Sequence, residues 1–384
     1  MRLCISIILM ISVGFSLAFD VFAPATGWAL CRRGFCRADQ LHPSPSYKPA
    51  HQTLEDLQLA LELDPANPYR WAELGIYLDE RADRHGAQPF FSRAEGLGSF
   101  TPPVLTVAVN HYLMDSQPDR ALALAHRVLT LTADFDELLF ATFGQMGRPL
   151  HDFLDTAIPA QRRPATAWMK WLIPRAPEAD LIETWHWLRD RGLAEDDIMG
   201  GLLQELCKRC TCNQASRLWA EWLGPQRGDY LRPEFLFNRH FINAPRPGPF
   251  DWTIEPTPAV GILPQDGLQF TFDGSENLSY RGLRQVAPIG PGVYRFSAVV
   301  ESNELTTNQG TSFHIYDSVS PARLHVATPM VLGTTPRHTV EVVFTVTAPA
   351  CGVVVQLERL PSEKFDNRIA GTFTIHEVSL RPLH

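Results

Sequence analysis

Apolar residues recur at helical spacing between residues 53 and 224. Leu54, Leu57 and Leu61 lie three or four positions apart, which is the spacing of one face of an α-helix. The segment 64–68 (Asp-Pro-Ala-Asn-Pro) follows, and its prolines and asparagine are typical of the end of one helix and the start of the next. This part of the chain therefore predicts a series of short helices.

The helical pattern repeats with a period of 34 residues. Pro68 and Pro102 are separated by this distance, and Asp136 follows after the same interval. Trp71 then aligns with Leu105. Such a period is that of a helix–turn–helix unit that stacks on its neighbours. From about residue 139 the repeat decays, and we expect the tryptophans of the later helices to pack between helices.

After Gly224-Pro225 the pattern changes to alternating apolar and polar residues between turn residues. Short alternating stretches without a helical pattern predict an antiparallel β-sandwich. We expect at least seven strands, at Leu268–Phe272, Gly292–Val300, Thr311–Tyr316, Arg323–Ala327, Thr339–Val346, Val353–Arg359 and Gly371–Leu380.

The helical part resembles the tetratricopeptide repeat (TPR) family. The residues that carry the resemblance are those of the pattern LxLDPANPxxWxxLGxxL, which runs from Leu61 to Leu78. Members of this family stack helix pairs into a curved surface that binds a peptide or a protein domain. The resemblance therefore implies a protein partner for the helices.

The β part resembles bacterial jelly-roll modules of the galactose-binding and carbohydrate-binding kind, over roughly residues 232–380. Proteins that pair TPRs with such a module resemble components associated with exopolysaccharide production. The resemblance therefore implies that the sandwich binds a polysaccharide. It is carried by Phe237–Phe241, Pro249–Trp252, Gly292–Phe296 and Phe373–Leu380.

In this jelly-roll family, acidic residues of the opening and closing strands often hold a structural calcium. The matching positions here are His240 and Ile242 in the opening strand, and His376 and Glu377 in the closing strand. Calcium needs several oxygen ligands, and only Glu377 provides an obvious one. We therefore expect neither a metal site nor a cofactor.

The N-terminus contains Leu3–Phe19, an uncharged apolar stretch that fits a signal peptide or a membrane anchor. It predicts an envelope protein, exported or held at the inner membrane, with its bulk outside the cytoplasm. If the stretch is not cleaved, it places the chain at the membrane. We divide the chain into a signal segment (1–22), a linker (23–52), a TPR-like domain (53–224) and a jelly-roll domain (225–384).

Charge and motif content exclude several functions. The net charge is −8 and basic residues form no dense block, so a nucleic-acid partner is not expected. No nucleophile–base arrangement, phosphate-binding glycine loop or metalloprotease motif occurs, so we expect no enzyme. The alternative of a glycan-active enzyme needs two carboxylates, for which Glu358 with Glu377 or Asp273 are the candidates.

Cysteines add a second indication of the compartment. Cys31 and Cys36 are neighbours in the linker, and Cys207, Cys210 and Cys212 cluster. Structural disulfides fit an oxidising compartment. Free thiols and a metal or redox site remain alternatives for the cluster.

Strand alternation divides the side chains of the sandwich into an inward and an outward set. Saccharides are bound by aromatic surfaces beside planar polar groups, because sugar rings offer both C–H faces and hydroxyls. His314 and His325 are expected to lie close together across a hairpin, as solvent-facing neighbours. The alternatives are an ordinary solvated sheet face without a ligand and, for Trp252, burial. The candidate glycan-binding residues are Trp252, Tyr280, Arg295, Gln309, His314, Tyr316, Gln356 and Glu358.

Overall fold

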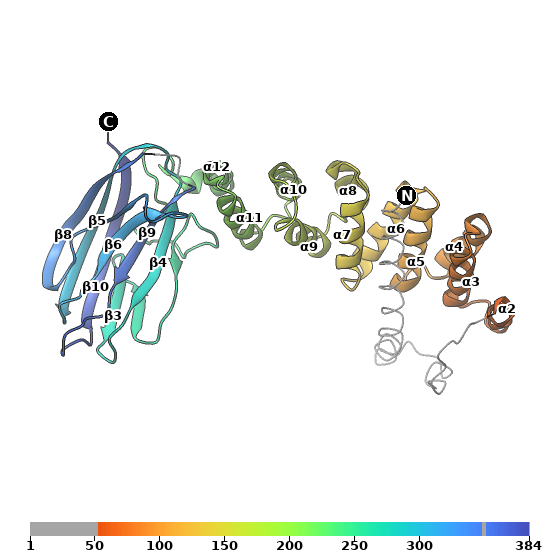
Figure 1. The fold of residues 1–384 in the computed structure, drawn as a ribbon, viewed down its shortest axis with the longest axis horizontal. Helices are drawn as coiled ribbons and strands as arrows, with labels where there is room; N and C mark the ends of the chain where they lie inside the picture. The colour runs from red at the N-terminus through yellow and green to blue at the C-terminus, as the bar shows by residue number, and fades with distance from the viewer. Residues whose placement is uncertain (1–52, 348–350, 384) are drawn as a thin grey trace.

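The computed structural model describes residues 53–347 and 351–383 and shows a helical array that leads into a β-sandwich (Figure 1). Within these residues, the helices all precede the strands along the chain. The predicted fold class, a TPR-like α-helical array followed by an antiparallel β-sandwich, is confirmed.

The helices of the array are short and closely spaced. They are α2 (Leu54–Leu63), α3 (Pro68–Glu80), α4 (Arg84–Leu97), α5 (Pro102–Met114), α6 (Pro118–Leu131), α7 (Asp136–Gln145), α8 (Leu150–Thr156), α9 (Arg162–Leu172), α10 (Glu178–Asp190), α11 (Asp196–Lys208) and α12 (Cys212–Leu223).

Helix starts follow the predicted 34-residue period. Helices α3, α5 and α7 begin at Pro68, Pro102 and Asp136, as the repeat requires. Proline is favoured in a first turn because its missing N–H has no partner there anyway. Asn67 completes the start of α3, since its side chain accepts a hydrogen bond from the Tyr69 N–H at 3.0 Å.

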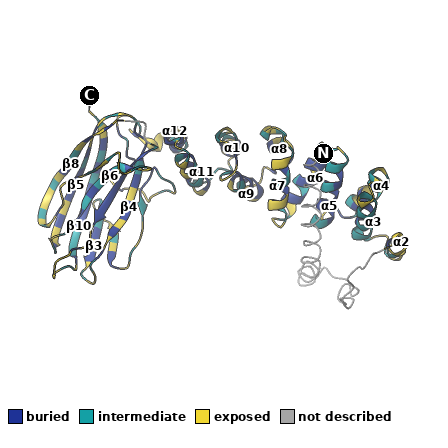
Figure 2. Cartoon of the chain, in the orientation of Figure 1, coloured by how far each residue is buried: buried dark blue, intermediate teal, exposed yellow. Residues whose placement is uncertain are grey.

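The helix pairs pack through close contacts. A side chain at Gly75 of α3 would place its Cβ 2.8 Å from the ring of Phe91 in α4, so glycine permits this approach. Helix α5 is covered along most of its length (Figure 2). Within it, the buried His111 contacts Asp79 of α3 at 2.9 Å and stacks on Phe91. These contacts link the α3–α4 pair to α5 of the next repeat.

Ten strands follow. They are β1 (Thr253–Ile254), β2 (Val260–Pro264), β3 (Leu268–Asp273), β4 (Tyr280–Ala287), β5 (Gly292–Leu305), β6 (Ser312–Asp317), β7 (His325–Ala327), β8 (Gly333–Val346), β9 (Val353–Arg359) and β10 (Ala370–Pro382).

The strands form two antiparallel sheets. One, the β9 sheet, has the order β1-β4-β9-β6-β7, and the other, the β10 sheet, has the order β2-β3-β10-β5-β8. Their inner faces enclose a common apolar core in which, for example, Phe296 of β5 meets Phe313 of β6 with ring centroids 5.0 Å apart. The β9 and β10 strands are central, so side chains on their outer faces have neighbours on both sides.

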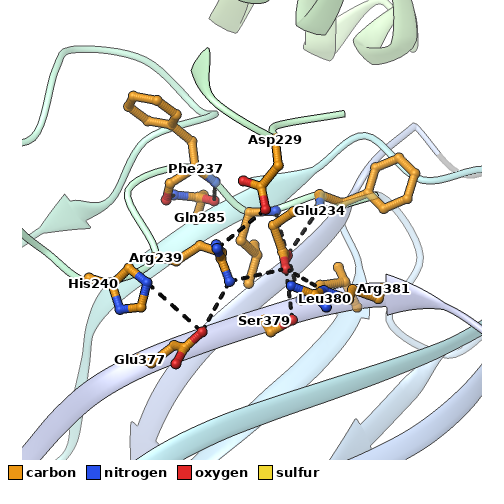
Figure 3. Close-up of polar contacts among 12 residues, drawn as sticks. Asp229, Glu234, Phe237, Arg239, His240, Gln285, Glu377, Ser379, Leu380 and Arg381 are labelled. Carbon is orange, nitrogen blue, oxygen red and sulfur yellow. Dashed lines mark hydrogen bonds and ion pairs between the residues drawn. The ribbon is translucent and has the colours of Figure 1, made fainter. Parts of the chain in front are cut away.

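The segment that enters the sandwich is fastened by the buried carboxylate of Glu234 (Figure 3). Its Oε1 accepts hydrogen bonds from the backbone N–H groups of Phe235 at 3.1 Å and Leu380 at 2.6 Å. Its Oε2 accepts one from the Ser379 hydroxyl at 2.7 Å. These bonds connect the entry segment to the last strand, β10.

The end of the helical array is tied covalently to the sandwich. Two disulfides occur among the described residues, Cys207–Cys212 and Cys210–Cys351. The second joins the turn before α12 to the residue pair that precedes β9. The predicted structural disulfides are thus present in the cysteine cluster, with Cys351 as a partner that the sequence pattern did not indicate.

Two predictions concern residues outside the described part of the chain, namely the apolar stretch Leu3–Phe19 and the pair Cys31 and Cys36. Within residues 53–347 and 351–383, none of the helices has both the length and the apolar character needed to cross a bilayer.

Candidate functional site

A cluster of polar side chains lies on the outer face of the β9 sheet. Strands β6 and β9 are neighbours there, with His314 opposite Gln356 and Ser312 opposite Glu358. Strand β7 adds His325, whose neighbour Val326 lies opposite Ile315. Because alternate residues of a strand share one face, Ser312, His314 and Glu358 come together while Phe313 and Leu357 enter the core.

The cluster is a continuous chain of polar contacts. Arg281 of β4 donates hydrogen bonds to Oε1 of Glu358 from Nε at 2.9 Å and from Nη2 at 2.6 Å. The other oxygen, Oε2, lies 3.4 Å from Nδ1 of His314. That same nitrogen forms a 2.9 Å hydrogen bond with Nε2 of His325, and Nε2 of His314 forms one of 3.1 Å with the Ser312 hydroxyl.

A second pair extends the cluster towards α12. The Tyr316 hydroxyl donates to Oε1 of Gln356 at 3.1 Å, and the Gln356 amide donates to the backbone oxygen of Arg281 at 2.9 Å. Strand β4 is therefore connected to β9 through side chains as well as through the ladder.

Burial affects the titration of this cluster. Partial burial lowers the pKa of His314, because the charged ring is poorly solvated, and Glu358 opposes the effect only in part. Burial likewise raises the pKa of Tyr316. At neutral pH the ring of His314 is therefore neutral, with one donor and one acceptor nitrogen.

A pocket of about 300 Å³ opens beside the cluster. Its floor contains Ser312, His314 and Glu358, and its walls include Met330 and Leu360, which are 43% and 44% exposed. The remaining lining residues are Gln309, Gly310, Ala327 and Thr328. This volume lies at the lower end of the range of small-molecule sites, about 300–1,000 Å³.

The structure brings together five of the eight predicted site residues. Gln309, His314 and Glu358 line the pocket. Gln356 is the strand partner of His314 and is hydrogen-bonded to Tyr316. Gln356 and Glu358 are buried, whereas strand alternation predicted a solvated face. The reason is that β9 is the central strand, and Arg281, His314 and Tyr316 cover its outer face.

Three predicted residues lie elsewhere. Trp252 and Tyr280 are 1% and 2% exposed and belong to the core of the sandwich, so neither side chain is presented to a ligand. Trp252 packs on Phe241, and Tyr280 packs on Phe270. Arg295 is exposed, but it belongs to β5 and therefore to the other sheet.

The sequence reasoning missed several residues of the site, among them Ser312, Arg281, Met330 and Leu360. Ser312 lies two residues before His314 on the same face of β6, so the same alternation could have predicted it. Arg281 was missed because β4 was not predicted as a strand. Met330 lies in the loop before β8, and Leu360 lies in the loop after β9. In loops, strand alternation does not indicate which way a side chain points.

Two of the positions that match the family's calcium site, His240 and Glu377, belong to an ion-pair cluster (Figure 3). Nη1 of Arg239 lies 3.0 Å from Glu377, and its Nη2 lies 3.3 Å from Asp229. Within the described ranges, no group of three or more histidine, cysteine, aspartate or glutamate side chains is arranged to hold a metal ion.

The carboxylates considered for glycan hydrolysis are distributed over two sheets. Glu358 belongs to β9, whereas Glu377 and Asp273 belong to β10 and β3 of the other sheet. The β9-sheet pocket therefore contains Glu358 as its only carboxylate among the described lining residues.

No protein-family model matches the chain, and no curated protein matches it. Among solved structures, it is similar to TmCBM61 in complex with β-1,4-galactotriose, at 15% identity over 39% of this chain and 99% of that chain, with a TM-score of 0.27. It is also similar to the CBM22-1 xylan-binding domain of Xyn10C from Paenibacillus barcinonensis, at 13% identity over 38% of this chain and 91% of that chain, with a TM-score of 0.24.

For the helices, a similar structure is YrrB, described as a TPR protein with an unusual peptide-binding site. The identity is 12% over 45% of this chain and 93% of that chain, with a TM-score of 0.25. Scores and identities this low add no argument about function.

Proposed function

We propose that this protein is a non-catalytic envelope adaptor, in which the β-sandwich binds a polysaccharide and the helical array binds a protein partner during exopolysaccharide assembly or export. The observation that carries the glycan half is the pocket on the β9 sheet. It combines hydrogen-bonding groups at Gln309 and Ser312 with the apolar walls Met330 and Leu360. Sugar rings need both kinds of surface.

The contacts of Glu358 support a binding role over a catalytic one. Arg281 occupies one oxygen of its carboxylate, and His314 faces the other. Glycoside hydrolysis by a carboxylate pair needs a second acid or base across the pocket. The other two candidates belong to the opposite sheet.

Stacked helices provide the surface for the protein partner. Repeat arrays of this kind present an extended face along the stack. The disulfides at the junction fit an oxidising compartment, as does the apolar stretch Leu3–Phe19 of the sequence.

The test is calorimetric binding of the purified 384-residue chain to polysaccharide fractions of the producing cell. Gln309→Ala removes a hydrogen-bonding amide of the pocket and should weaken binding about two- to tenfold. Arg295→Ala, on the other sheet, is the control and should leave binding unchanged. A folded protein that binds none of the fractions would instead favour a purely structural scaffold.

That second candidate has its own support. The helical array and the sandwich are joined by the Cys210–Cys351 disulfide and by the pair Arg246 and Asp196, 3.5 Å apart. In addition, Trp219 of α12 packs on Phe237 of the entry segment with ring centroids 6.0 Å apart. A β-sandwich that is attached to the helical array by these contacts also fits a structural role as the terminal domain of a scaffold.

A further inference from the structure

The floor of the β9-sheet pocket consists of polar groups that contact one another. Arg281 donates two hydrogen bonds to one oxygen of Glu358. The ring of His314 is hydrogen-bonded to His325 and Ser312, and its Nδ1 lies 3.4 Å from the other oxygen of Glu358. A ligand that competes for these groups has to break existing bonds. The side-chain amide of Gln309 takes part in none of these contacts, and the hydrogen bonds of this residue involve its backbone.

The walls of the pocket are apolar and held in place. Met330 and Leu360 line it from two different loops although each is more than two-fifths exposed. The sulfur of Met330 accepts a hydrogen bond of 3.0 Å from the Gly310 N–H, which fixes the thioether beside the pocket. Ala327 and Thr328 also line the pocket.

The volume of the pocket also restricts which ligand it can hold. A pocket of about 300 Å³ is at the small end of ligand sites, so it fits one sugar residue rather than a run of several. A hydroxyl placed against Met330 and Leu360 would lose its water without gaining a partner, which is unfavourable. A methyl group in the same position is favoured by burial.

We propose that this pocket selects a sugar residue with a methyl-bearing substituent, either an acetyl group or the C6 methyl group of a deoxy sugar. This inference rests on the proposed function, because it names the kind of saccharide bound at the same site. One buried methyl group should strengthen binding about fourfold over the parent sugar.

Matched sugars test the inference on the intact chain. By NMR titration, N-acetylglucosamine is compared with glucose, and L-fucose with L-galactose. Native polysaccharide is compared by calorimetry with the same polysaccharide after mild alkaline treatment, which removes O-acetyl esters and leaves N-acetyl amides in place. A preference in the first pair, or loss of binding upon removal of the O-acetyl esters, identifies the acetyl group. A preference in the second pair identifies the deoxy sugar.

Substitutions of the apolar wall residues test whether these residues cause the preference for methyl-bearing sugars in a protein that is still folded. Leu360→Asn and Met330→Gln should reduce the preference to less than about twofold, because each replaces an apolar contact by an amide. Leu332→Asn is the control, since Leu332 is 42% exposed but does not line the pocket. Circular dichroism and the thermal midpoint establish that each variant is folded.

The outcomes distinguish the inference from the proposed function. Equal binding of both members of each sugar pair, with undiminished binding of the deacetylated polysaccharide, overturns the inference and leaves the proposed function in place. Absence of binding to any saccharide by the folded chain overturns both. A preference that persists in Leu360→Asn and Met330→Gln also overturns the inference, since the selective contact would then lie elsewhere.

Discussion

Arg281 contacts Glu358 through two nitrogens that converge on a single carboxylate oxygen, at 2.9 Å and 2.6 Å. Glu358 is buried, whereas the Arg281 side chain is mostly exposed. The arginine therefore fixes the orientation of the carboxylate and leaves its second oxygen for His314.

Removing this arginine should destabilise the sandwich. Arg281→Met leaves the buried carboxylate of Glu358 without its cation, at a cost of about 1 to 3 kcal/mol in the free energy of unfolding. Urea denaturation measures it. Arg284→Met is the matched control, because Arg284 and Glu255 form an exposed pair at 2.8 Å that contributes less than about 1 kcal/mol. An equal loss of unfolding free energy in Arg281→Met and Arg284→Met would show that the buried contact with Glu358 stabilises the fold no more than an exposed ion pair does.

Stability should depend on pH through His314. Burial holds its pKa below the usual 6.5, so the unfolded chain takes up a proton more readily than the folded chain. The contribution of the neutral ring is complete above pH 6.5 and is lost as the pH falls from there towards the lowered pKa. His314→Gln should therefore flatten the pH dependence of the urea midpoint between neutral pH and pH 5. His151→Gln, at an exposed position of the helical array, should leave the profile as in the parent chain.

The two disulfides should differ in their effect on stability. Cys210 and Cys351 are 141 residues apart, whereas Cys207 and Cys212 are 5 apart. Chain entropy assigns about 5 kcal/mol to the long loop and about 2 kcal/mol to the short one. The double variant Cys210→Ser/Cys351→Ser should thus lower the thermal midpoint more than Cys207→Ser/Cys212→Ser. The reverse order would mean that the long crosslink constrains little in the unfolded chain.

A pair of glycines tests the packing of α3 on α4. Gly75→Ala places a methyl group against the buried ring of Phe91 and should destabilise the array by about 1 to 3 kcal/mol. Gly96 has open space around its Cβ position, so Gly96→Ala should stabilise α4 by about 0.5 to 1 kcal/mol. Thermal unfolding followed at 222 nm measures both. Stabilisation by Gly75→Ala would contradict the close approach of the two helices.

Much of the fold was predictable because its signals are local. Proline at the first turn marks helix starts at Pro68 and Pro102, and alternation marks the longer strands. Strand β4 was missed because its pairing with β9 shifts register between Tyr280 and Leu283, which disrupts the period of two. Strands β1 and β2 are short, and β2 ends in Pro264.

The candidate site was less predictable because it depends on the order of strands in each sheet. Alternation indicates on which side of its own strand a residue lies, but not to which sheet the strand belongs. Arg295 was therefore placed with His314 although they belong to different sheets. For the same reason, the burial of Glu358 could not be derived from β9 alone, since its cover comes from β4 and β6.

The Cys210–Cys351 disulfide gives β9 a covalent link to the end of the helical array. Cys351 precedes β9 by two residues, and Glu358 at the pocket lies near the far end of the same strand. If the pocket holds a polysaccharide, as proposed, tension on that polymer would act along β9 in shear. The hydrogen-bond ladders of β9 to β4 and β6 would resist it. The tension would then pass to the helical array through the Cys210–Cys351 disulfide. The peptide segment after α12 would therefore bear less of the force.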